Sequence, residues 1–354
     1  MRAAVMRDVG AVDLDDIPEP KTDPAGALLR VDACGICGTD ARTFFNGDPR
    51  APVPWVLGHE PVGTLVEVGP DADLPPAVAR GGRVFLGSIL TCGECRWCTD
   101  GYQNMCERNE LYGYDPYPGA YAEYAAVPPI ATKNLFPFPP ELPSFLATVA
   151  DPFACALNGV EVLDPGYGDT VVILGCGPIG CWQAVLCRDR GVGRLALSDV
   201  SADRLDRALS IVGRFVDDAF VAGEDNGVEE VLRLTGGAGA DRVIVAAPSK
   251  EAQAAALLMA GRRARVVYFA GLPKHDPVSS LDMNQLHYKE LAVLGAYGAT
   301  HRQYRITMGY LDRRRADLEP IVTHRLPLDE IADGFAAIRS GSALKVVIEP
   351  EGGR

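Results

Sequence analysis

The chain has 354 residues, of which 47% are hydrophobic and 23% are charged, and its formal net charge is -13. This length is enough for two domains, and the acidic balance argues against a nucleic-acid partner, because such proteins usually present a basic face. No membrane span is visible, and the start, MRAAVMRDVGAVDLDDIPEP, lacks the continuous apolar core of a secretory signal. We therefore expect a cytoplasmic protein whose ten cysteines stay reduced and serve metal binding or catalysis.

The first 150 residues are rich in glycine, proline and short β-branched runs such as GTLVEVGP and GGRVFLGS, which predicts many short strands joined by turns. Two clusters of reactive side chains lie in this part. CGICGTD (34–40) supplies Cys37 and Thr39, and GHEPVG (58–63) supplies His59 and Glu60. Neither cluster is decisive alone, because a single buried cysteine or histidine is more often packed in a core.

A third cluster, TCGECRWCTDGYQNMC (91–106), has almost no aliphatic content and the spacing C-x2-C-x2-C-x7-C. Its cysteines are Cys92, Cys95, Cys98 and Cys106. Gly93 and Gly101 permit the tight turns that bring four sulfurs around one centre. The pattern favours a closed tetrahedral zinc site that stabilises a loop and has no open position for substrate. An iron–sulfur cluster or unrelated buried thiols are the alternatives.

Beyond residue 150, apolar strands alternate with helical patterns. The expected strands are residues 170–177, 194–200, 241–248, 263–273 and 291–298, and residues 201–213 and 250–262 have helical periodicity. Repeated strand and helix alternation predicts a parallel, doubly wound sheet.

The first of these strands leads into GCGPIG, a G-x-G-x-x-G turn that opens a helix. Its residues are Gly175, Cys176, Gly177, Pro178, Ile179 and Gly180. Gly175 permits the turn, Gly177 leaves room for a pyrophosphate, and Gly180 lets helix and strand pack closely. The phosphates would lie at the helix N-terminus, where free amides favour negative charge. The alternative is a glycine turn that binds nothing.

Asp199 ends the next strand, 19 residues after Gly180. A carboxylate there can accept both ribose hydroxyls of adenosine and repels a 2′-phosphate, which favours NAD over NADP. Arg204, five residues on, weakens that preference. Ala247, Ala270 and Gly271, which follow later strands, are expected to contact the same cofactor.

Taken with DPFACALNGVE (151–161), these motifs resemble the zinc-dependent alcohol dehydrogenases of the medium-chain dehydrogenase/reductase superfamily, over essentially the whole chain. The closest resemblance is to the polyol, sorbitol and cyclitol dehydrogenase-like branch. It implies an α/β fold in which a Rossmann domain, residues 154–296, is inserted into a mainly β, GroES-like catalytic domain, residues 1–153 and 297–354. It also implies homodimers or homotetramers.

The resemblance assigns Cys37 and His59 to a catalytic zinc, which makes two zinc ions per chain. At the third ligand position, where relatives have a cysteine or a glutamate, this chain has Asp151, which is one methylene shorter than glutamate. Our prediction is a set of Cys37, His59 and Asp151, with Glu60 bound directly or adjacent to the set. Asp151 precedes Pro152 and could instead cap the following helix.

In the resembling enzymes a hydroxyl at the position of Thr39 passes on the proton of the alcohol. Many relatives have a histidine three residues further along, where this chain has Arg42. Arginine cannot shuttle a proton near neutral pH, so the outer part of the relay must be water, the ribose hydroxyls or another group. Arg42 could alternatively meet an anionic substrate or a cofactor phosphate.

The resemblance therefore predicts hydride transfer between NAD and a secondary alcohol or ketone, with a polyol, cyclitol or sugar-like substrate. A threonine-type 3-hydroxy amino acid or a glucose-type aldose is the alternative substrate. The non-enzymatic alternative is a zinc-ribbon scaffold or binding protein in which the cysteine loop docks a partner.

Overall fold

The computed structural model describes residues 1–273 and 275–350. The chain divides into two compact units: unit 1 is residues 1–154 together with the return from residue 299, and unit 2 is residues 155–298. Among the described residues, no helix combines the length and the apolar character that crossing a membrane requires.

The strands of unit 2 are β10 (Thr170–Leu174), β11 (Arg194–Asp199), β12 (Asp218–Val221), β13 (Ala240–Val245), β14 (Ala260–Tyr268) and β15 (Ala292–Gly295). Within the described residues they form one sheet in the order β12-β11-β10-β13-β14-β15, and every neighbouring pair is parallel. The predicted parallel sheet is confirmed. Strand β12 was not predicted, because its four residues alternate between half-buried and exposed and make no apolar run.

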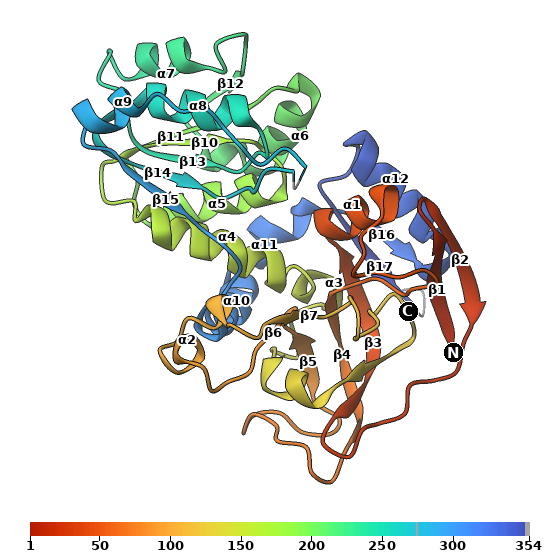
Figure 1. Cartoon of the computed structure of the whole chain (residues 1–354). Coiled ribbons are helices and arrows are strands. Elements are labelled where there is room, and N and C mark those ends of the chain that lie inside the picture. The colour runs from red at the N-terminus through yellow and green to blue at the C-terminus, as the bar shows by residue number, and fades with distance from the viewer. Residues whose placement is uncertain (274, 351–354) are drawn as a thin grey trace. The chain divides into compact units, whose positions relative to one another are not determined.

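The helices of unit 2 are α5 (Pro178–Asp189), α6 (Ala202–Val212), α7 (Val228–Leu234), α8 (Lys250–Met259) and α9 (Met283–Tyr288), preceded by α4 (Ala150–Leu163) at the boundary with unit 1. Helix α5 covers one face of the sheet, and α7 and α8 cover the other (Figure 1). The central strand is therefore buried on both faces, which explains the continuous apolar run of β10. Helix α6 buries Leu205, Ala208 and Val212, which lie on one stripe at helical spacing.

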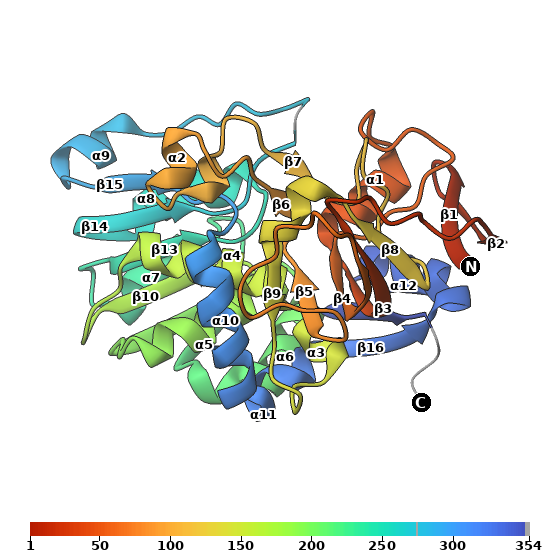
Figure 2. The same ribbon diagram turned by 90° about the horizontal axis from the view of Figure 1, so that it is seen from below.

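The strands of unit 1 are β1 (Arg2–Asp8), β2 (Ala11–Asp16), β3 (Ala27–Ile36), β4 (Glu60–Val68), β5 (Arg83–Leu86), β6 (Ile89–Leu90), β7 (Glu110–Leu111), β8 (Tyr124–Val127), β9 (Leu135–Pro137), β16 (Val322–Pro327) and β17 (Lys345–Glu349). Its helices are α1 (Gly38–Asn46), α2 (Arg96–Thr99), α3 (Ser144–Ala147), α10 (His301–Arg313), α11 (Arg315–Leu318) and α12 (Ile331–Ser340). In the described part, the main sheet has the order β16-β17-β3-β4-β5-β9, with β8 also paired to β3 (Figure 2).

Strand β3 lies at the centre of this sheet and determines which distant residues meet. Its antiparallel register places Gly35 opposite Glu60 of β4, and Ile36 opposite Val346 of β17. The chain leaves β3 at Ile36 and enters α1 at Gly38, so the end of β3 brings three segments together. Sheet pairing thus joins the N-terminal motifs to a strand near the end of the chain.

Candidate functional site

Cys37, His59 and Glu60 meet at the end of β3. Each offers one ligand atom, and these atoms all lie within 4.8 Å of one another. The register of β3 and β4 explains the meeting, because residues 35 and 60 are paired directly. Gly35 is needed here, since a Cβ at that position would lie 2.1 Å from the Glu60 carboxylate.

Asp40 orients the His59 ring. Its Oδ1 lies 2.8 Å from His59 Nδ1, and Tyr121 donates its hydroxyl to Oδ2 at 2.8 Å. Burial opposes protonation of the ring, but the charges of Asp40 and Cys37 outweigh it, so that the pKa of His59 is well above its usual value. A carboxylate on one ring nitrogen is the usual support of a metal-binding histidine. The sequence motif contained Asp40, but its role was not predicted.

Glu60 is completely buried and forms an ion pair with Lys345. Lys345 Nζ donates to Glu60 Oε2 and, at 3.0 Å, to the carbonyl oxygen of Ile36. The other carboxylate oxygen, Oε1, is buried without a hydrogen-bond partner among the described residues. A buried, unpartnered carboxylate oxygen beside a thiol and an imidazole is a donor set that fits zinc. Sequence analysis did not identify Lys345.

Asp151 lies outside this set, because no carboxylate oxygen of Asp151 lies within 4.8 Å of all three ligand atoms. It is in the first turn of α4. Its Oδ1 accepts hydrogen bonds from the Ser88 hydroxyl at 2.7 Å and the Tyr304 hydroxyl at 2.7 Å. The structure thus brings together Glu60, rather than Asp151, with Cys37 and His59. Within the described residues, no amide of α4 donates to the Asp151 side chain, so no capping bond forms.

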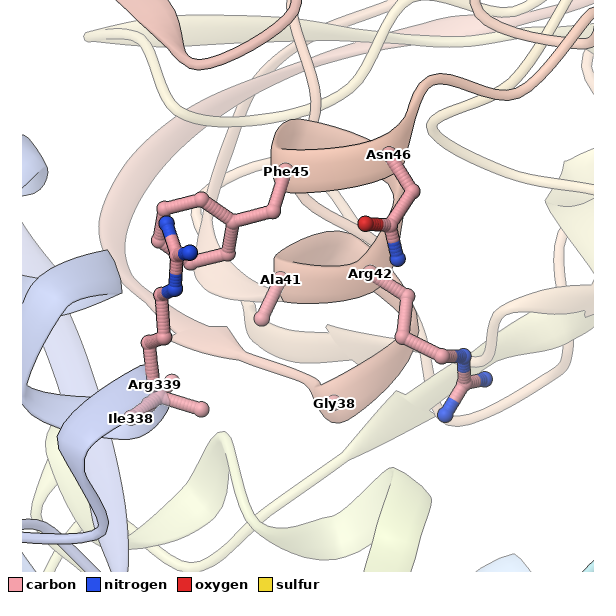
Figure 3. A pocket seen from close by; sticks show the side chains of 7 residues that line it. All are labelled: Gly38, Ala41, Arg42, Phe45, Asn46, Ile338 and Arg339. Carbon is pink, nitrogen blue, oxygen red and sulfur yellow. The ribbon is translucent and has the colours of Figure 1, made fainter.

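Thr39 and Arg42 lie on the first turns of α1, next to Cys37. Arg42 Nη2 donates to the Thr39 hydroxyl at 3.0 Å. Arg42 also lines an open cavity of about 320 Å³ in unit 1 (Figure 3). Gly38, Ala41, Phe45, Asn46, Ile338 and Arg339 complete its wall. The hydroxyl of Thr39, which is predicted to pass on the proton of the alcohol, therefore lies next to the positive charge of the Arg42 guanidinium.

The four cysteines of the 91–106 loop also form a cluster in which every ligand sulfur lies within 4.8 Å of the others. The sulfur of Cys92 lies 3.9 Å from that of Cys98 and 3.5 Å from that of Cys106, and Cys95 and Cys106 are 3.9 Å apart. Zinc–sulfur bonds of about 2.3 Å in a tetrahedron require sulfurs roughly 3.8 Å apart. The cluster therefore has the size of a four-thiolate zinc site.

Two glycines and several backbone amides shape this loop. Gly93 and Gly101 have φ values of 74° and 87°, which L side chains rarely adopt. Backbone N–H groups, first that of Glu94 and then that of Cys95, lower the pKa of Cys92 to about 6. A thiol that readily loses its proton is suited to metal binding.

The glycine turn of unit 2 has the predicted form. Gly175 has φ 105°, and a Cβ at Gly180 would lie 1.9 Å from the Gly175 carbonyl oxygen. Open space surrounds Gly177, which precedes Pro178 at the start of α5. The turn can therefore admit a phosphate group to the N-terminus of α5.

Asp199 ends β11 and faces this turn. Its carboxylate accepts N–H groups from Cys176 and Ser201, both at 3.0 Å, and pairs with Arg204 Nη1 at 2.9 Å. Ala247 lies next to Gly175. Ala270 donates to the Val245 carbonyl oxygen at 3.1 Å. Gly271 follows Ala270 after the end of β14.

Comparisons with known proteins match both parts of the chain. Residues 23–140 match the model of the alcohol dehydrogenase GroES-like domain, and residues 178–312 match that of the zinc-binding dehydrogenases. The L-threonine 3-dehydrogenase of Yersinia pestis (strain Pestoides F) is 31% identical over 348 residues, which are 95% of each chain.

Solved structures agree with these matches. An alcohol dehydrogenase from Thermus sp. ATN1 is 29% identical, covers 99% of each chain and has a TM-score of 0.85. A structure described as a zinc-binding dehydrogenase from Sinorhizobium meliloti 1021, bound to NADP, is 28% identical, with the same coverage and a TM-score of 0.85.

Proposed function

Since the chain belongs to the zinc-binding alcohol dehydrogenases of the medium-chain dehydrogenase/reductase superfamily, we propose that it oxidises the secondary alcohol of a small polar substrate, first of all a 3-hydroxy amino acid of the threonine type. The family makes it an NAD(P)-dependent oxidoreductase, so the scaffold interpretation of the cysteine loop no longer applies. The 31% identity to L-threonine 3-dehydrogenase along 95% of the chain supports a substrate of the threonine type.

The catalytic metal site of this proposal consists of Cys37, His59 and Glu60. Bound zinc supplies Lewis-acid activation of the substrate alcohol, and the nicotinamide supplies the hydride acceptor. Asp40 fixes the ring of His59, and Lys345 fixes one oxygen of Glu60, so the free oxygen keeps its direction.

The proton of the alcohol would pass to the Thr39 hydroxyl as that hydroxyl gives its own proton to water or to a ribose hydroxyl of the cofactor, because the Arg42 guanidinium cannot accept it. Arg42 donates to that hydroxyl and leaves its oxygen oriented for a further hydrogen bond. The positive charge of Arg42 also suits the carboxylate of an amino-acid substrate.

A polyol is the second candidate. The buried carboxylate of Asp151 favours it, because only one of its two oxygens is hydrogen-bonded to described residues and the other can accept a substrate hydroxyl. Reduced-nicotinamide absorbance, followed with L-threonine, 2,3-butanediol, sorbitol and inositol, separates the two. Turnover of L-threonine alone supports the first candidate, turnover of sorbitol or inositol alone supports the second, and no turnover of any alcohol by zinc-loaded protein contradicts both.

Cofactor choice and assembly belong to the same proposal. Asp199 favours NAD. Its partner Arg204, however, supplies a positive charge that suits the 2′-phosphate of NADP, so both cofactors bind.

Strand β15 lies at the edge of the parallel sheet in the described part of unit 2, and we expect a second copy to pair with it. Size-exclusion chromatography should then give a dimer or tetramer, and a monomer at all concentrations excludes this interface. With ten cysteines, four of them in a cluster of the size of a zinc site, the protein would work in the cytoplasm, where thiols stay reduced.

A further inference from the structure

Tyr121 contacts both segments that supply the proposed metal ligands. Its backbone N–H donates to the carbonyl oxygen of Leu57 at 3.0 Å, so it lies beside the segment that leads into His59. Its hydroxyl lies 2.8 Å from Asp40 Oδ2 and 3.2 Å from the carbonyl oxygen of Gly35, near the end of β3. One side chain thus joins the two parts of the chain that meet at this site.

Packing fixes the ring of Tyr121. Gly58, the residue before His59, has φ 106°, and a Cβ there would lie 2.9 Å from Cδ1 of the ring. Phe335 of α12 contacts the ring edge to face, with centroids 6.1 Å apart. Only 1% of Tyr121 is exposed. The hydroxyl therefore has little freedom to leave Asp40, and a phenylalanine at this position would keep the same packing.

The two oxygens of the Asp40 carboxylate have separate partners. Oδ1 lies 2.8 Å from His59 Nδ1, whereas Oδ2 accepts the Tyr121 hydroxyl at 2.8 Å and the backbone N–H of Cys37 at 3.4 Å. A tyrosine hydroxyl has one proton, and the short contact makes Asp40 its main acceptor. Asp40 is completely buried, so an oxygen that lost this donor would find no water to replace it.

We propose that Tyr121 is a positioning residue for the catalytic metal site. By holding Oδ2 of Asp40, it keeps Oδ1 directed at His59 Nδ1, and the imidazole then presents Nε2 to the metal. Without the hydroxyl, the carboxylate can rotate and the ring of His59 loses its fixed orientation. The inference rests on the proposed function, since it assumes that zinc binds to Cys37, His59 and Glu60.

The test compares the full-length, zinc-loaded protein with the variant Tyr121→Phe, which removes the hydroxyl and keeps the ring. Metal analysis after equilibration with graded EDTA should show that the zinc ion bound by Cys37 and His59 is held roughly tenfold more weakly. The affinity of the four-cysteine loop should stay the same.

A nuclear magnetic resonance measurement follows the His59 ring directly. In protein with ¹⁵N-labelled histidine, the Nδ1 proton that His59 shares with Asp40 should exchange with water faster in Tyr121→Phe than in the wild type. His59→Asn identifies this signal by its loss.

Two further variants separate positioning from general damage. Tyr112→Phe removes the hydroxyl of another buried tyrosine, which donates to the Ala126 carbonyl oxygen at 2.9 Å, and it should change neither the zinc affinities nor the His59 signal. In an Asp40→Asn background, Tyr121→Phe should cause no additional loss of zinc affinity, because the hydroxyl acts through the carboxylate.

Three results would overturn the inference: unchanged zinc affinity in Tyr121→Phe, an equal loss in Tyr112→Phe, or the same loss from Tyr121→Phe in the Asp40→Asn background. Failure of the proposed function is distinguishable. If Tyr121→Phe weakens zinc binding as expected but the wild type oxidises no alcohol, only the proposed function fails. If Cys37→Ala retains both zinc ions, the assumed metal site is absent and both fail.

Discussion

Lys345 and Glu60 form a buried ion pair although 285 residues separate them in the chain. Their side chains are only 4% and 0% exposed. The pair joins β17 to β4 across β3, and it fixes one oxygen of the carboxylate that faces Cys37 and His59.

The first prediction concerns this pair. Lys345→Met should leave the Glu60 carboxylate buried and unpaired, and removing one partner of such a pair costs about 3–5 kcal/mol. Urea unfolding followed by circular dichroism measures this loss. As the control, Arg7→Ala breaks two surface ion pairs, with Asp13 and Asp15, in which the arginine is 47% exposed, and it should cost less than about 1 kcal/mol. Equal losses in the two variants would contradict the assigned role of the buried pair.

The second prediction concerns the cysteine loop. Each chain should hold two zinc ions, and Cys95→Ser should reduce the count to one, because a closed site needs all four thiolates. Metal analysis of dialysed protein gives the count, and limited proteolysis should show faster cleavage within residues 91–106. Cys155→Ser, which changes a cysteine outside both clusters, should retain both ions. A wild-type count below two, or no loss in Cys95→Ser, would exclude the four-thiolate site.

The third prediction concerns cofactor choice. Asp199→Asn removes the charge that repels a 2′-phosphate and keeps an acceptor for the Cys176 amide, so NADP should bind about tenfold more tightly relative to NAD. Arg204→Ala should change the ratio in the opposite direction. Calorimetric titration with each oxidised cofactor measures both ratios.

A matched control exists at the opposite end of β11. Asp218→Asn removes a carboxylate that pairs with Arg194, the first residue of β11, whereas Asp199 is the last. The ratio of NADP to NAD affinity should be the same as in the wild type. A similar change of ratio in this variant would mean that net charge, rather than the position of Asp199, determines cofactor choice.

The fourth prediction concerns acid stability. Burial, reinforced by the charge of Arg305, lowers the pKa of His301 to about 4 from its usual value of 6.5. Its Nε2 is buried without a partner among the described residues. Because the folded pKa is below the unfolded one, the unfolded state takes up the proton first. Stability is therefore complete above pH 6.5 and is lost as the pH falls toward 4, by about 2 kcal/mol between pH 7 and pH 5.

His301→Phe should remove this part of the acid sensitivity. The ring packs edge-on against Phe136, with centroids 5.5 Å apart, so an aromatic replacement preserves the contact. Chemical unfolding at several pH values should give a flatter profile for the variant between pH 7 and pH 5. If the two profiles remain parallel, His301 does not titrate with folding.

Local patterns were sufficient for much of the fold. The apolar run of β10 and the helical spacing of Leu205, Ala208 and Val212 are patterns within one segment, so the sequence alone was enough to predict these elements. Strand β12 was not predicted, because its residues are half-buried or exposed and show no apolar run. Its strand conformation depends on pairing with β11. The four-cysteine cluster and the glycine turn could also be predicted from the sequence, because each depends on the spacing of residues within one short loop.

By itself, the sequence determined which side chains were available: four closely spaced cysteines, the Cys37 and His59 motifs, a G-x-G-x-x-G turn, and Asp151, where the resembling enzymes have cysteine or glutamate. Only the tertiary structure decided how the carboxylates are used. Lys345 pairs with Glu60 through the register of β17, β3 and β4, and Tyr304 reaches Asp151 across 153 residues of chain. Sheet pairing and helix packing determine which residues so far apart in the chain become partners. The spacing of residues within one segment therefore cannot predict them.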